Sequence, residues 1–150
     1  MNMQTSPNDL QVRIEQRLRT MRTLWGALLM SIVVYYLFTR FTEQPTEVNP
    51  NSSLSLILVA IALLTIPISF VIKKKLLTQA VAQQRVEIVQ QGYIISWAIT
   101  EVAALLGILD FFLTGNPYYF VLMIIAACGT LLNFPRRQHV IDALFKTRTL

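Results

Sequence analysis

Residues 93–113 read YIISWAITEVAALLGILDFFL, and this stretch decides the fold. As a helix it is long enough to cross the ~30 Å hydrocarbon core of a bilayer, which takes ~20 apolar residues. Three further apolar runs occupy residues 24–39, 54–72 and 118–134. Only 14% of the residues are charged, against roughly 25% in an ordinary soluble domain. We therefore expect an all-α polytopic membrane protein with four transmembrane helices, forming one membrane domain over residues 1–150.

The basic residues predict an orientation. Of the 13 lysines and arginines, only Arg40 lies in the loop after the first apolar run or in the loop after the third. Cytoplasmic loops carry the excess of Lys and Arg, so we expect both termini in the cytoplasm, N-in/C-in. The basic residues expected to contact anionic inner-leaflet lipids are Arg13, Arg17, Lys73, Lys74, Lys75, Arg136 and Arg137. The basic residues thus flank the expected spans on one side of the membrane, a distribution that does not indicate a nucleic-acid-binding protein.

Polar helical segments are expected on the cytoplasmic side, at residues 7–23, 73–92 and 136–147. Ser6-Pro7-Asn8-Asp9 reads as a helix start, and apolar residues then recur at helical spacing into the first span. The segment 73–92 lacks loop residues, which predicts a helical hairpin that could dock a partner. Gly115-Asn116-Pro117 predicts a tight turn, so spans three and four form an antiparallel hairpin.

Glu101 is the residue whose chemistry stands out. It lies near the middle of span three, where a carboxylate is costly and intramembrane ionisable residues are functional candidates. It either holds a proton or cation, or is a neutral group that fixes helix register, and we favour the second reading. Asp110 lies three residues from the end of the span, which predicts an interfacial, solvated carboxylate. His139 follows Pro135 among basic residues and is expected on the surface.

Small and polar residues form one face of span three and one face of span four, which predicts close helix packing. The two faces are Ser96, Thr100, Ala103, Gly107 and Asp110, and Ala126, Gly129, Thr130 and Asn133. If the turn centres near Asn116, Thr130 lies at the depth of Glu101. A hydrogen bond from Thr130 to Glu101 is therefore expected.

Residues 98–107, AITEVAALLG, resemble the carboxylate helix of rotary ATPase proteolipid subunits, where a glutamate precedes small residues, leucine or tyrosine, and glycine. The stretch from Gly92 through Gly115-Asn116-Pro117 to Phe134-Pro135-Arg136-Arg137 resembles a group of small bacterial four-span membrane proteins without assigned activity. That resemblance implies a bacterial inner membrane and no mechanism.

The sequence contains no phosphate-binding loop, catalytic triad pattern or metal-spaced cluster, and it has one His and one Cys. We therefore expect neither an enzyme nor a cofactor or metal. The leading hypothesis is a structural or accessory subunit, with a membrane-protein partner or self-association. The alternative is a small oligomeric transporter or proton/cation-conducting protein that uses Glu101, with Asp110 as a second candidate carboxylate. The candidate ion or register site comprises Glu101, Thr100, Thr130 and Asp110.

Overall fold

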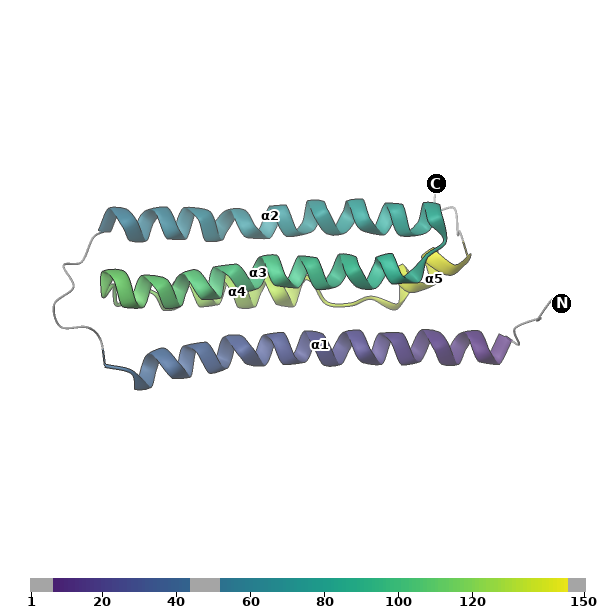
Figure 1. Cartoon of the computed structure of the whole chain (residues 1–150), viewed down its shortest axis with the longest axis horizontal. Coiled ribbons are helices and arrows are strands. Elements are labelled where there is room, and N and C mark those ends of the chain that lie inside the picture. Colours follow the sequence, from purple (N-terminus) through teal and green to yellow (C-terminus); the bar gives the residue numbers. More distant parts are fainter. Residues whose placement is uncertain (1–6, 44–51, 146–150) are drawn as a thin grey trace.

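The computed structural model describes residues 7–43 and 52–145, and every regular element in these two segments is a helix. The expected all-α class is confirmed. Figure 1 shows α1 to α4 lying along the long axis of the molecule, with α5 at one end. The helices are α1 (Pro7–Phe41), α2 (Ser52–Gln83), α3 (Val86–Thr114), α4 (Phe120–Leu132) and α5 (Arg137–Phe145).

The helices form a stack of three layers. The α3–α4 hairpin is the middle layer, with α1 on one side and α2 on the other (Figure 1). Helix α2 packs most extensively against α3, whereas α1 contacts both α3 and α4. Within the described segments, no Cα atom of α1 lies within 8 Å of a Cα atom of α2. The hairpin therefore separates the backbones of the two outer helices.

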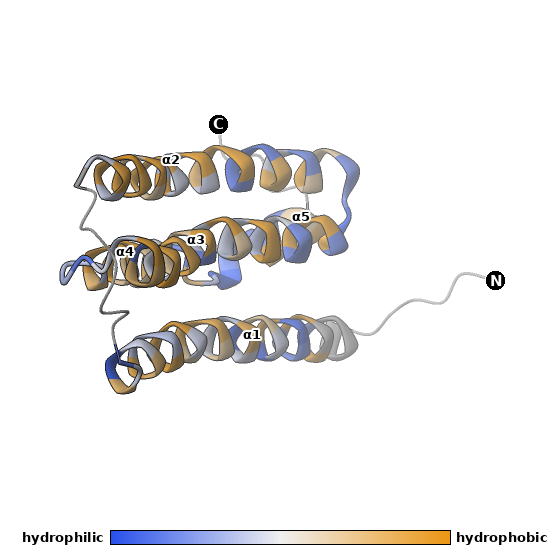
Figure 2. Ribbon diagram, turned by 60° about the vertical axis from the view of Figure 1, so that its left-hand side comes forward, coloured by the Kyte–Doolittle hydropathy of each residue, from blue (hydrophilic) through white to orange (hydrophobic). Residues whose placement is uncertain are grey.

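The two ends of the stack differ in polarity. One end, which we call the basic end, holds the start of α1, the α2–α3 turn and α5, whereas the opposite end holds the α3–α4 turn and the last turn of α1. Hydrophobic residues cover the helices between the ends, and hydrophilic residues gather toward the basic end (Figure 2). This pattern is typical of helices that cross a bilayer.

Three helices are long and apolar enough to cross a membrane, in the segments Ile14–Phe41, Ser53–Gln83 and Val86–Thr114. Helix α4 has only 13 residues, about 20 Å at 1.5 Å per residue, which is shorter than the hydrocarbon core. Together with α5, to which it is bent by 46°, it could form a fourth span. The described segments thus contain three candidate spans, or four if this bent pair is one.

The break after α4 departs from the expected straight span over residues 118–134. The helix ends at Leu132, and residues 133–136 are not helical. Pro135 explains the break, because it lacks a backbone N–H and keeps the preceding residue out of the helical conformation.

The polar helical segments continue the apolar ones. Helix α1 runs unbroken from Pro7 to Phe41. Helix α2 continues beyond the expected end of its span at residue 72, and α3 begins before the expected start of its span at residue 93, so that the two helices meet at a turn of Gln84 and Arg85. Gln84 has φ 51°, a left-handed conformation that reverses the chain in two residues. Residues 146–147 of the expected tail segment lie outside the described residues.

The predicted packing faces are confirmed. All five residues of the α3 face are buried, and so are the four residues of the facing stretch that ends at Asn133. Among the glycines that lie within the described helices, Gly129 has the least room: an added Cβ there would lie 2.8 Å from Thr100 Cγ2. Helix α2 supplies a third face of small and polar residues, also buried: Ser55, Ala62, Thr65 and Ser69.

Candidate functional site: polar side chains inside the helix stack

Glu101 faces α1. Its Oε1 accepts a hydrogen bond from Ser31 Oγ at 2.8 Å and one from Tyr35 OH at 3.1 Å. Ser31 and Tyr35 are four residues apart on α1, so they lie on one face of that helix. The side chain of Glu101 is half-buried. We call these three residues the Glu101 group.

The expected hydrogen bond from Thr130 to Glu101 is wrong. Thr130 Oγ1 instead pairs with Thr100 Oγ1 at 3.2 Å. Thr100 Oγ1 also lies 2.9 Å from the backbone oxygen of Trp97, to which it donates. Thr100 and Glu101 are consecutive and thus about 100° apart around α3. Thr100 therefore faces α4, whereas Glu101 faces α1.

Asp110 belongs to a second polar group at the opposite end, with Ser55, Thr114 and Asn116. Its Oδ1 accepts hydrogen bonds from Ser55 Oγ and, at 2.8 Å, from Thr114 Oγ1. Asn116 Nδ2 donates to Ser55 Oγ at 2.7 Å, which ties the α3–α4 turn to the first turns of α2. Gly115 has φ 60°, a left-handed conformation that glycine adopts without strain and that ends α3.

The expectation that Asp110 is solvated is wrong. Its side chain is fully buried, because α2 and the turn cover it. The second carboxyl oxygen, Oδ2, has no hydrogen-bond partner within the described residues. The group thus uses one oxygen to hold two helices and a turn together.

Lys73 joins α2 to the break after α4. Its Nζ donates to Asn133 Oδ1 and lies 4.6 Å from the ring centroid of Phe70. Asn133 Nδ2 in turn donates to Gly129 O at 2.9 Å and to Ser69 Oγ at 3.2 Å. Lys73 was expected at the membrane surface, but it is only 9% exposed. An ammonium group here also complements the negative C-terminal end of α4.

Two tryptophans satisfy carbonyl groups at the end of α4. Trp25 Nε1 of α1 donates to Thr130 O at 2.8 Å, and Trp97 Nε1 of α3 donates to Asn133 O at 3.0 Å. The last carbonyl groups of a helix have no partners within that helix, so these indoles stabilise the C-terminal end of α4. Neighbouring helices thus compensate for the short fourth helix.

His139 is half-buried at the start of α5, contrary to the expected surface position. Its Nδ1 lies 2.6 Å from Tyr93 OH, and the backbone N–H of Arg136 donates to the same hydroxyl at 3.1 Å. Burial lowers the pKa of His139, and the positive charges of Lys73 and Arg136 lower it further, while Asp142 acts in the other direction. The folded structure therefore favours the neutral form of the imidazole.

Most of the predicted surface cations do lie at the basic end. Arg17 forms an ion pair with Glu87 of α3 at 2.7 Å, and Lys74, Lys75, Arg136 and Arg137 are exposed. The side chain of Arg13 lies outside the described residues. No three His, Cys, Asp or Glu side chains in the described segments lie together as a metal site.

Sequence reasoning missed the partners that α1 and α2 contribute: Ser31, Tyr35, Ser55, Ser69 and Trp25. A signal was present in α2, because Ser55, Ala62 and Ser69 recur every seven residues, which places them on one face. Helix α1 offers no such regular pattern around Ser31. Comparison of the chain with protein-family models, with curated proteins and with solved structures finds no significant match.

Proposed function

We propose that the chain is a structural or accessory subunit of a larger membrane complex. The observation that carries this proposal is the three-layer arrangement, in which no Cα atom of α1 lies within 8 Å of one of α2 within the described segments. Each helix consequently presents a long apolar outer surface. Val34 on α1, Leu64 on α2 and Ile124 on α4 are each more than half exposed, at 56%, 57% and 54%. Helices of a partner can pack against such surfaces as lipid tails do.

The interior supports the same proposal. The hydrogen bonds of the Glu101 group and the Thr100–Thr130 pair join helices to one another at mid-length. Lys73 and Asn133 do the same at the break after α4. A polar group that already has a partner in the chain serves to fix helix register, a role that needs no substrate. We accordingly propose no catalytic activity.

We further propose that the basic end faces the cytoplasm and that the membrane is a bacterial inner membrane. The orientation rests on the charge bias. Of the 13 Lys and Arg, 12 occur in the sequence at residues 13–22, 73–85 and 136–148, whereas Arg40 lies in the last turn of α1 at the opposite end. The choice of membrane rests on the resemblance of residues 92–137 to small bacterial four-span proteins.

Co-purification tests the subunit proposal. The protein is extracted from its own membranes in a mild detergent, and the single cysteine, Cys128, gives a site-specific cross-linking probe because it is exposed on α4. We expect a second membrane polypeptide, or a second copy, to co-purify and to be captured from Cys128. Cys128→Ser is the matched control, which keeps the complex and loses the cross-link. A lone, monodisperse monomer would contradict the proposal.

A second candidate function is proton or cation conduction through Glu101. The observation that favours it is the half-buried carboxyl group of Glu101, which lies in an apolar part of α3 and accepts hydrogen bonds from the hydroxyl groups of Ser31 and Tyr35 on α1. Glu101→Gln keeps the acceptor oxygen and removes ionisation, whereas Glu101→Leu removes both. Loss of flux in Glu101→Gln with unchanged stability would support conduction. Wild-type flux in Glu101→Gln with lower stability in Glu101→Leu would leave the register role.

A further inference from the structure

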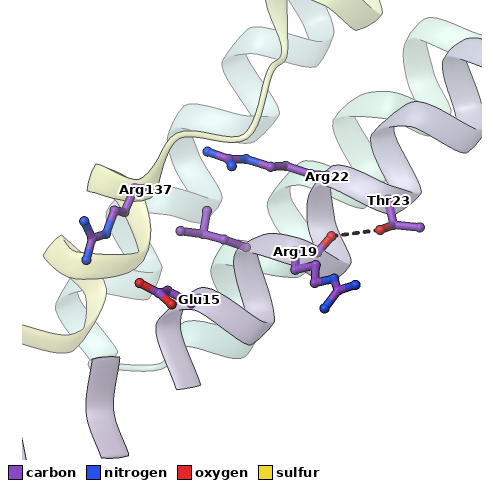
Figure 3. A pocket seen from close by; sticks show the side chains of 6 residues that line it. Glu15, Arg19, Arg22, Thr23 and Arg137 are labelled. Carbon is purple, nitrogen blue, oxygen red and sulfur yellow. Dashed lines mark hydrogen bonds between the residues drawn. The ribbon is translucent and has the colours of Figure 1, made fainter. Parts of the chain in front are cut away.

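A groove lies between α1 and the start of α5 at the basic end (Figure 3). It has a volume of about 620 Å³, within the range of small-ligand sites. The residues that line this arginine groove are Glu15, Leu18, Arg19, Arg22, Thr23 and Arg137. Figure 3 shows Arg22 extending from α1 toward the chain that precedes α5, and Arg137 extending from the start of α5 with its guanidinium directed away from Arg22.

The arginine groove carries an excess of positive charge. It has three guanidinium groups and one carboxylate, that of Glu15. The ion pair that the described residues form is between Arg17 and Glu87, so Arg19, Arg22 and Arg137 are not neutralised there by a carboxylate. The start of α5 at Arg137 adds the positive end of a helix dipole. An anion is the complement of this arrangement.

The surface beside the groove is apolar. The Arg22 guanidinium lies 5.7 Å from the ring centroid of Phe134, which packs edge-on against Trp25 at 5.1 Å. On the α4 side of the groove, Leu131 and Phe134 are exposed by 50% and 42%. The groove is thus at the boundary between a charged end and a hydrophobic surface, where a phospholipid changes from headgroup to acyl chains.

We propose that the arginine groove binds the phosphate of an anionic phospholipid, whose acyl chains lie along the exposed surface of α1 and α4. Arg22 of α1 and Arg137 of α5 hold the phosphate between the two helices once the exposed Arg137 side chain turns inward, since guanidinium groups match its oxygens bidentately. Arg19 adds charge at the rim. Glu15 opposes the phosphate and weakens binding of a headgroup without an amine. This site is distinct from a diffuse attraction of all basic residues to the membrane.

The test uses delipidated protein in detergent, titrated with phosphatidylglycerol and followed by native mass spectrometry. We expect one lipid to be retained well above the others. Each arginine-to-phosphate bond is charge-assisted, so Arg22→Gln and Arg137→Gln should each weaken that first binding about tenfold. The matched control is Lys75→Gln/Arg85→Gln, which removes two charges from the same end outside the groove. It should leave the first binding within about twofold, by the small effect expected of screened charges.

Three further measurements distinguish a lipid from a free phosphate, and a specific site from a general attraction between charges. Glu15→Gln should strengthen phosphatidylglycerol binding, because it removes the opposing carboxylate. Arg22→Lys/Arg137→Lys keeps the charge and loses the bidentate geometry, so it should weaken binding even if the Gln variants do not fold. Inorganic phosphate should not displace the lipid.

Equal losses in the groove variants and the control would overturn the proposal in favour of general attraction. Full binding by the Lys variants would also overturn it. Displacement by millimolar inorganic phosphate would assign the groove to a soluble phosphate instead.

Discussion

Replacing Gly129 by alanine tests how closely α3 and α4 approach. The new Cβ would lie 2.8 Å from Thr100 Cγ2, 3.2 Å from Thr100 Cβ and 3.5 Å from Ile66 Cγ1. Carbon atoms pack best at about 3.5–4.0 Å, so the first two contacts are too short. Thr100 cannot rotate away without losing its hydrogen bonds to Trp97 O and Thr130 Oγ1.

The magnitude follows from two opposing effects. Overpacking a tight interior destabilises by about 1–3 kcal/mol. Alanine in place of glycine in a helix contributes about 0.5–1 kcal/mol in the stabilising direction. We therefore expect Gly129→Ala to lower the free energy of unfolding by about 1–2 kcal/mol.

Gly26 provides the matched control. It lies inside α1, and an added Cβ there would meet no atom within 4 Å. Gly26→Ala should consequently raise the free energy of unfolding by about 0.5–1 kcal/mol. The same chemical change thus has opposite signs at the two positions.

Reversible unfolding in mixed detergent micelles measures both variants, together with Thr100→Ser and the double variant. Thr100→Ser removes the methyl group at 2.8 Å and keeps the hydroxyl. It should therefore lessen the effect of Gly129→Ala, although the 3.2 Å contact with Thr100 Cβ remains. Equal stabilisation by both alanines, or no coupling between positions 100 and 129, would refute the packing described here.

Three other predictions concern the polar groups. Asn133→Leu leaves the Lys73 ammonium without its acceptor and should destabilise the protein by about 2–4 kcal/mol in the same unfolding assay. The double variant Lys73→Met/Asn133→Leu should recover much of that loss. A double variant as unstable as the sum of Lys73→Met and Asn133→Leu would contradict this. Asp110→Asn should fold normally, because its amide oxygen still accepts from Ser55 and Thr114, whereas Asp110→Leu should lose stability; equal stability of the two would argue against the group. Because the pKa of His139 is lowered on folding, stability should fall as the pH drops below about 6.5, and His139→Gln should flatten that dependence between pH 7 and pH 5; an unchanged profile would count against the buried imidazole.

The sequence predicted the helical class and the interior faces because both follow from short-range periodicity. Ser96, Thr100, Ala103, Gly107 and Asp110 recur at helical spacing, and all five are buried. The Gly115-Asn116-Pro117 turn likewise predicted the α3–α4 hairpin. These features need no knowledge of distant segments.

The partners of the polar residues depend on long-range packing, which hydropathy does not contain. Pairing Thr130 with Glu101 was off by one residue, and one residue turns a helix face by about 100°. Asp110 lies near the end of its apolar run, but Ser55 and Asn116 cover it from α2 and the turn. Hydropathy likewise does not show where α4 ends, because the apolar run continues to Phe134 although the helix ends at Leu132.

The proposed role as a subunit is tested most directly by native mass spectrometry of the protein released from its own membranes without overexpression. The chain alone has a mass of 17.1 kDa. We predict a stable, stoichiometric species that contains this chain and at least one other protein chain, and that persists when bound lipid is removed. A species at the mass of the single chain, with lipid as its only companion, would contradict the account.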